Sequence, residues 1–151
     1  MALPLELVRG TFSQELEAAR RVAARAGFEL DADVDGLTIK ATFHAPAGRD
    51  FILHGRFDDY PSQPPFLEFE DPATGERGTA GSLPRSADSF FHSGCSICAP
   101  FNRNAYVKVH TNWQLAAWKT STEQNVCWNQ YSTMPKMLWL IASRIHDSNF
   151  N

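Results

Sequence analysis

Two cysteines close together, Cys95 and Cys98, are the residues of this chain best suited to chemistry, and they lie in the run GCSIC at residues 94–98. A thiol near its reference pKa of about 8.5 is mostly protonated at neutral pH but remains a reactive nucleophile. We expect Cys98 to be a nucleophile in an exposed loop. The alternative is that Cys98 is a buried, inert thiol that packs as a small apolar residue.

The spacing HxxCxxC, formed by His92, Cys95 and Cys98, allows two further interpretations. A structural zinc site takes four ligands, so His110 or Cys127 would have to complete it. A thioredoxin-like redox pair needs its CxxC at the start of a helix within a βαβ unit, and the run of strands upstream argues against that. We therefore expect no metal and no cofactor, and a structural role for Cys127.

Composition places the chain among ordinary globular proteins, with 43% hydrophobic and 21% charged residues. Its 151 residues predict one domain over 1–151 with a sizeable core. A net charge of -3 does not favour nucleic-acid or anionic-membrane partners, and no apolar run approaches the ~20 residues of a membrane span. The first ten residues do not resemble a signal peptide, and three cysteines favour a reducing compartment. We expect a cytoplasmic protein.

The elements that must position these residues begin with a helix over Thr11–Ala26. Thr11 and Gln14 have the spacing of a capping box, and Gly27 suits the position just after the helix. The expected apolar stripe consists of Leu16, Ala19, Ala23 and Ala26. Two strands should follow, Phe28–Val34 and Leu37–His44, joined by a turn at Asp35-Gly36.

The stretch from Asp50 to Asp71 predicts two more strands joined by a proline-rich link. Apolar residues alternate with polar ones from Phe51 to Asp58, which is the period of a strand. The prolines at positions 61, 64 and 65 lack an N–H for the sheet and must end that strand. An apolar run resumes at Phe66. The prolines could also serve merely to stop a strand, without forming a rigid platform.

The rest of the chain predicts a loop, an irregular segment and a helix. Pro72–Ser89 is rich in glycine and small residues and should be an exposed, mobile loop. Phe90–Trp118 should be irregular, with a short strand at Ala105–His110, while Lys119–Gln130 is polar and ambiguous. Thr133–His146 should be a helix with Pro135 in its first turn. Its expected core stripe is Met134, Met137, Leu138, Ile141 and Ile145. The fold class is α+β, with a helix, a four-stranded antiparallel meander, an irregular segment and a helix packed on the sheet.

This order resembles the ubiquitin-conjugating enzyme family over about Thr11–Ile145. The matching motifs are the link YPSQPP at residues 60–65 with Phe69, then SIC at residues 96–98, then Trp113 (or, as a second choice, Trp118), then an apolar helix. The resemblance implies an enzyme that accepts a ubiquitin-like protein from an activating enzyme as a thioester on Cys98 and transfers it to a target protein.

Several features depart from the family pattern. The usual His-Pro-Asn ahead of the cysteine is missing, and the segments on both sides of Cys98 are longer than usual. The two final helices of eukaryotic members have no room. The chain thus looks more like divergent bacterial members, several of which are linked to antiphage defence. The link motif also fits the noncatalytic relatives called RWD domains, so a binding scaffold of the same fold is the leading alternative, and a small zinc-binding module a more distant one.

The resemblance implies roles for polar residues around Cys98. The attacking lysine needs a base, and Asp88 and His92 are the candidates. The oxyanion of the tetrahedral intermediate needs donors, for which Asn102 and Asn104, or Asn112, could replace the missing asparagine. The first helix of the family commonly helps to bind the activating enzyme. The corresponding candidates here are Arg20, Arg21 and Arg25, which otherwise form a solvated face.

Overall fold

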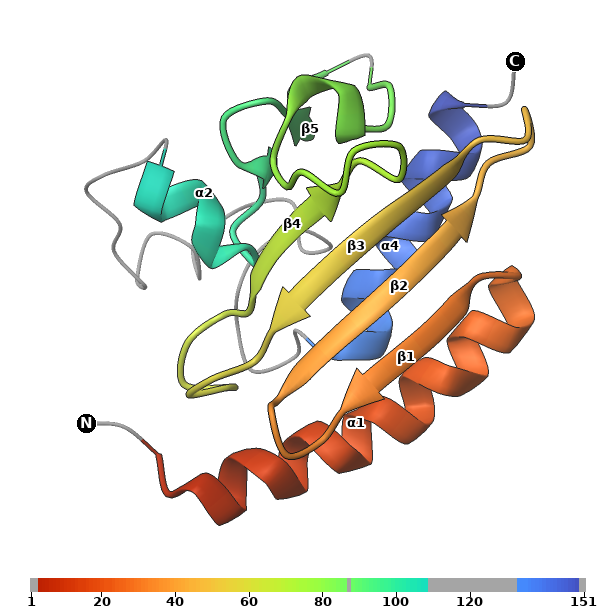
Figure 1. The fold of residues 1–151 in the computed structure, drawn as a ribbon. Coiled ribbons are helices and arrows are strands. Elements are labelled where there is room, and N and C mark those ends of the chain that lie inside the picture. Colours follow the sequence, from red (N-terminus) through yellow and green to blue (C-terminus); the bar gives the residue numbers. More distant parts are fainter. Residues whose placement is uncertain (1–2, 87, 109–132, 150–151) are drawn as a thin grey trace.

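The computed structural model describes residues 3–86, 88–108 and 133–149 (Figure 1). Its elements in chain order are α1 (Leu5–Ala26), β1 (Glu29–Asp33), β2 (Thr38–His44), β3 (Asp50–Arg56), β4 (Phe66–Glu70), the 3-10 turn η1 (Ala80–Ser82), β5 (Phe91–His92), β6 (Ser96–Ile97), α2 (Arg103–Lys108) and α4 (Met134–Ser148). The prediction of an α+β protein with an N-terminal helix, a four-stranded antiparallel sheet and a later helix is confirmed.

The first helix begins earlier than predicted. α1 starts at Leu5, after Pro4, and no side chain caps its N-terminus. Thr11 is therefore inside the helix, and its interpretation as a capping residue is wrong. The physical reason is that the apolar stripe continues toward the N-terminus through Phe12 and Val8, which are both buried in the core.

The end of α1 lies where the sequence predicts it. Gly27 adopts a left-handed conformation with φ of 82°, and its N–H donates to the carbonyl of Ala23 at 2.8 Å. Glycine adopts this conformation without the steric cost of a Cβ. Of the predicted stripe, Leu16, Ala19 and Ala23 are buried, whereas Ala26, the last helical residue, is exposed.

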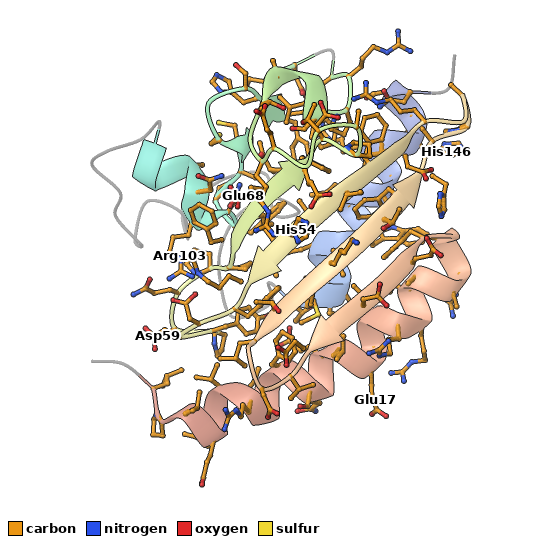
Figure 2. All side chains as sticks on the ribbon, viewed as in Figure 1. Glu17, His54, Asp59, Glu68, Arg103 and His146 are labelled. Carbon is orange, nitrogen blue, oxygen red and sulfur yellow. The ribbon has the colours of Figure 1, made fainter. Side chains whose placement is uncertain are left out.

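The sheet is an antiparallel meander in the order β1-β2-β3-β4. Its register places Leu53 of β3 opposite Ala41 of β2 and Phe69 of β4, and all three side chains are buried. Residues between them, such as His54 and Glu68, point to the other face (Figure 2). The predicted alternation along β3 is therefore confirmed. α1 runs beside β1, and α4 lies behind the sheet (Figure 1).

The helix α4 closes the core. Thr133 is its N-cap and accepts a hydrogen bond from the N–H of Lys136 at 3.5 Å, and Pro135 lies in the first turn as predicted. The predicted stripe of Met134, Met137, Leu138, Ile141 and Ile145 is buried throughout. α4 ends at Ser148, slightly beyond the predicted end.

The proline-rich link joins the sheet to both long helices. Tyr60 has no exposed surface, and Pro64 and Pro65 are buried. The Tyr60 hydroxyl donates to the carboxylate of Glu15 in α1, which also accepts the N–H of Met134 at 2.7 Å. Burial raises the pKa of Glu15, and these two hydrogen bonds offset only part of that rise. One carboxyl group thus connects α1, the link and the start of α4.

Two predictions between the link and α4 need correction. The segment predicted as a strand at Ala105–His110 is the helix α2 as far as Lys108, and its last two residues lie outside the described part. The reason is the side chain of Asn102, whose Oδ1 accepts the N–H of Asn104 and so begins a helical turn. The loop Pro72–Ser89 contains η1 and is not exposed throughout, because Ser82 and Pro84 are buried.

Arg103, the first residue of α2, fastens that helix to the link (Figure 2). Its guanidinium donates to both carboxylate oxygens of Asp58, at 2.8 and 3.2 Å, and to the Gln63 side chain at 3.1 Å. Its N–H donates to the carbonyl of Pro65 at 2.9 Å. The link therefore holds the segment that follows Cys98 as well as the two long helices.

Gly55 occupies an inward position of β3 where no side chain fits. A Cβ there would lie 2.9 Å from Ile39 Cγ1 and 3.1 Å from both Leu67 Cδ2 and Phe57 Cε1. We expect Gly55→Ala to lower the free energy of unfolding by about 1–3 kcal/mol through overpacking. Gly10→Ala is the control, because Gly10 lies in an exposed part of α1 with no atom within 4 Å of an added Cβ.

We expect Gly10→Ala to raise the free energy of unfolding by about 0.5–1 kcal/mol, since glycine is unfavourable within a helix. Urea unfolding of the two variants beside wild type measures both effects. Equal or greater stability of Gly55→Ala would show that the core can shift around this position.

Candidate functional site: the cysteine segment at the sheet edge

Residues 90–104, here called the cysteine segment, cover β4, the strand at one edge of the sheet. Edge strands present unpaired backbone groups that must be satisfied when they are buried. Here side chains satisfy them. Oδ1 of Asn102 accepts the N–H of Leu67 at 2.9 Å, Oγ of Ser96 accepts the N–H of Phe69 at 3.0 Å, and Nδ2 of Asn104 donates to the carbonyl of Leu67 at 3.1 Å. The cysteine segment is thereby fixed to the sheet.

Within this segment β5 and β6 form a small hairpin that pairs Phe91 with Ile97 and His92 with Ser96. Ser96 has a φ of 66°, which is uncommon outside glycine, and its hydrogen bond to β4 accompanies this conformation. The N–H of Gly94 donates to Nδ1 of His92 at 2.9 Å. This contact assigns the ring proton of a neutral His92 to Nε2 and leaves Nδ1 as the acceptor.

The structure separates the two cysteines by exposure. Cys95 lies in the hairpin turn and is only 1% exposed, whereas Cys98 follows β6 and is partly exposed. A thiol that must meet another protein has to be reachable, so the geometry favours Cys98 over Cys95 as a nucleophile. Cys127 lies outside the described residues.

The two asparagines predicted as oxyanion donors have buried structural contacts. Nδ2 of Asn102 donates to the carbonyls of Cys95 and Ile97, at 3.1 and 2.8 Å. Nδ2 of Asn104 donates to Leu67 and Cys95, while its Oδ1 is buried without a hydrogen-bond partner among the described residues. Neither amide nitrogen is available to an oxyanion in this arrangement. The predicted catalytic role of both residues would require these contacts to break.

Asp88, a predicted base, is exposed and held by three donors. Hydrogen bonds from the Ser86 hydroxyl and the Phe90 N–H, together with the guanidinium of Arg144, hold the pKa of Asp88 well below its usual range. A carboxylate with a lowered pKa binds a proton weakly, which makes Asp88 a poor base for a lysine ammonium. In a neutral His92 ring the basic nitrogen is Nδ1, which accepts the Gly94 N–H, so His92 can take up a proton only if this contact opens.

Arg144 of α4 packs on Phe90, a contact that the sequence did not predict. Arg144 lies over the Phe90 ring, 4.6 Å from its centroid, and donates to Asp88 at 2.8 Å. The carbonyl of Phe90 in turn accepts the N–H of Cys98 at 2.7 Å. α4 thus supports Phe90, the residue whose carbonyl holds the N–H of Cys98. The sequence contains no signal for this, since Arg144 is one of several polar residues on an amphipathic helix.

The described residues contain no group of three or more His, Cys, Asp or Glu side chains placed to hold a metal ion. His110 and Cys127, the predicted fourth ligands of a zinc site, lie in the range 109–132, which the structure does not describe. Asn112, Trp113 and Trp118 lie in the same range, as does the segment 119–130.

The three arginines predicted to bind an activating enzyme are all exposed on α1. Arg20 differs from the others because its guanidinium donates to the carbonyl of Leu30 at 3.2 Å. Leu30 belongs to β1, the other edge strand, so Arg20 covers a backbone group that would otherwise be open. Arg21 and Arg25, one helical turn apart, have no such contact among the described residues and are the better candidates for a partner.

We expect the double reversal Arg21→Glu/Arg25→Glu to slow charging by an activating enzyme, and more so at low salt, because rim charges mainly set association rates. The melting temperature should change only as surface substitutions change it. Lys40→Glu/Arg77→Glu is the control for the same change in net charge, because both residues lie at the sheet face that α1 and α4 do not cover. If the two double variants are charged at the same rate, Arg21 and Arg25 do not bind the activating enzyme and only face solvent.

A concave feature lies away from the cysteines, on the sheet face that α1 and α4 do not cover. It is a groove of about 320 Å³ that includes His54 and Glu68 in its lining (Figure 2). Acidic and basic side chains both line it: Asp31, Asp33 and Glu68 with Lys40, Arg56 and Arg77. His54 Nε2 lies 2.7 Å from the carboxylate of Glu70. This mixture of charges does not favour one class of ligand.

Comparison of the chain with protein-family models, with curated proteins and with solved structures finds no match. Within the part of the chain that the structure describes, no helix is both long and apolar enough to cross a membrane.

Proposed function

We propose that this protein is a ubiquitin-like protein conjugating enzyme with the ubiquitin-conjugating fold, and that Cys98 carries the modifier as a thioester. The observation that carries the proposal is the position of Cys98: it is the partly exposed cysteine of a segment that side chains fix to the sheet edge, while Cys95 is buried. The order of α1, the meander, the buried Tyr-Pro link and α4 supports the same fold.

In the proposed reaction the Cys98 thiolate attacks the thioester carbonyl of the modifier on its activating enzyme. A new C–S bond forms, and the thiolate of the activating enzyme leaves with the electrons of the old one. A target amine then attacks the carbonyl on Cys98, loses a proton to a base and expels the Cys98 thiolate. Each step exchanges one acyl bond for another, so no metal or redox cofactor is needed.

Within this proposal, the existing hydrogen bonds of the candidate side chains decide which groups accept the proton and which stabilise the oxyanion. His92 serves as the base in preference to Asp88, because a lowered pKa weakens Asp88 as a proton acceptor. Nδ1 of His92 must first release the Gly94 N–H. The oxyanion is met by backbone N–H groups or by Asn112, because the amide nitrogens of Asn102 and Asn104 are engaged.

A noncatalytic scaffold that binds a ubiquitin-like protein or a ligase is the second candidate. The engaged amides of Asn102 and Asn104 favour it, because neither of these two side chains is then available as an oxyanion donor. A scaffold of this fold would bind the modifier without forming a covalent adduct. The bacterial type, the antiphage setting and the cytoplasmic location belong to the main proposal.

Incubation with the cognate activating enzyme, its modifier and ATP, followed by nonreducing gels, tests the proposal. We expect an adduct of this chain that a reducing agent removes, as a thioester requires. Noncovalent binding of the modifier without any adduct would support the scaffold in its place.

A further inference from the structure

The peptide bond that joins Ile97 to Cys98 is held at both of its polar atoms. The carbonyl of Ile97 accepts from Nδ2 of Asn102 at 2.8 Å, and the N–H of Cys98 donates to the carbonyl of Phe90 at 2.7 Å. A peptide unit is planar, so it cannot rotate without breaking one of these bonds. The direction of the Cys98 side chain from its backbone is thereby constrained.

The Asn102 side chain, which donates to the Ile97 carbonyl, has all of its hydrogen-bonding positions occupied. Asn102 has no exposed surface. Its Oδ1 accepts from the N–H groups of Leu67 and Asn104, and its Nδ2 donates to Cys95 and Ile97. An amide offers two donors and two lone pairs, and all four are taken. Asn102 therefore joins the sheet edge, the start of α2 and the loop before Cys98 in one buried contact.

We propose that Asn102 is the positioning residue of the Cys98 thiol: it does not touch the reacting atoms but fixes the peptide that aims them. This inference rests on the proposed function for the reaction, and on the geometry alone for the positioning. A displacement of about 1 Å in a reacting group can lower a rate by about 100-fold, so a loosened Cys98 peptide should slow acyl transfer without weakening the docking of the activating enzyme.

Asn104 provides the matched control. It is also an asparagine without exposed surface, and its Nδ2 likewise donates to β4 and to the carbonyl of Cys95. It makes no hydrogen bond to the Ile97–Cys98 peptide among those of the described residues. Substituting Asn102 and Asn104 in turn therefore compares two similar buried amides, only one of which holds the peptide next to the nucleophile.

Single-turnover charging of Asn102→Ala and Asn104→Ala, corrected for the folded fraction, is the first measurement. We expect the maximal rate of Asn102→Ala to fall by about 10- to 100-fold, with the half-saturating concentration of activating enzyme unchanged, and Asn104→Ala to stay within about 3-fold of wild type. Where the alanine variants do not fold, Asn102→Asp and Asn104→Asp replace them: both remove the Nδ2 donors, and Asn102→Asp still accepts the N–H groups of Leu67 and Asn104. Parallel losses in the two variants would overturn the proposal.

Amide hydrogen exchange at Cys98 is the second measurement and needs no partner protein. Protection of the Cys98 N–H should fall in the Asn102 variant and persist in the Asn104 variant. Unchanged protection in the Asn102 variant overturns the positioning role whatever the charging assay shows. If wild type is not charged at all, the proposed function fails, and the exchange result still decides whether Asn102 holds this peptide.

Discussion

Cys98→Ala should abolish the thioester adduct completely, whereas Cys95→Ala should still be charged. The thioester requires a sulfur that a second protein can reach, and Cys98 is partly exposed while Cys95 is 1% exposed. Cys98→Ser should give either an oxygen ester, which resists reducing agents, or no adduct, because a serine hydroxyl is a weaker nucleophile than a thiol.

Nonreducing gels of the three variants beside wild type, with and without reducing agent, measure this result. Unfolding curves for each variant exclude loss of charging through loss of structure. Cys127→Ala is a further control for the cysteine in the range 109–132. An adduct on Cys98→Ala that a reducing agent still removes would move the carrier role to Cys95 or Cys127.

The sequence predicts most of the scaffold because the scaffold follows from local patterns. Alternation along β3 defines which residues face the core, and Leu53 and Phe51 are buried as it requires. The stripe of α4 is predicted completely, because 3.6-residue periodicity and the Thr133 cap both act within the helix itself. The start of α1 depends on burial against residues distant in the chain. The capping spacing at Thr11, a local pattern, therefore predicts the wrong first residue of the helix.

The candidate site is less predictable because its contacts link residues far apart in the chain. Cys98 is identified by its type and by the motif around it. The functions of Asn102 and Asn104 depend on β4, which lies about 35 residues earlier in the chain, and a single sequence contains no sign of that contact. The same holds for Arg144 beside Phe90. The strand predicted at Ala105–His110 fails for a local reason instead, since the Asn102 side chain accepts the N–H of Asn104 and starts a helix there.

Phe69→Ala should lower the free energy of unfolding by about 3–5 kcal/mol, the cost of truncating a buried phenylalanine. Phe69 has no exposed surface and lies opposite Leu53 in the register of β4 with β3. Its ring also meets Phe91 of β5 edge-on, with the centroids 5.8 Å apart, so it packs the cysteine segment against the sheet. A loss of this size is a large part of the 5–15 kcal/mol that typically stabilises a domain.

Phe66→Ala is the matched control, because Phe66 is the same residue type in the same strand but points to the other face. It is partly exposed, and the guanidinium of Arg56 lies 4.7 Å from its ring centroid. We expect Phe66→Ala to cost about 1 kcal/mol or less. Tyr60→Ala should resemble Phe69→Ala, because the Tyr60 ring is fully buried and its hydroxyl donates to Glu15.

Denaturant unfolding of these variants, run beside single-turnover charging, separates stability from chemistry. If the link and β4 serve only the core, the charging rate of Phe69→Ala falls in proportion to its folded fraction. The maximal rate, corrected for that fraction, should then equal the wild-type rate. A Phe69→Ala variant that unfolds like Phe66→Ala would mean that the two phenylalanines have exchanged faces, since a register shift of one residue inverts every side chain of a strand. The contacts of Ser96 and Asn102 with β4 would then be misplaced as well, and the positioning of Cys98 would lose its structural basis.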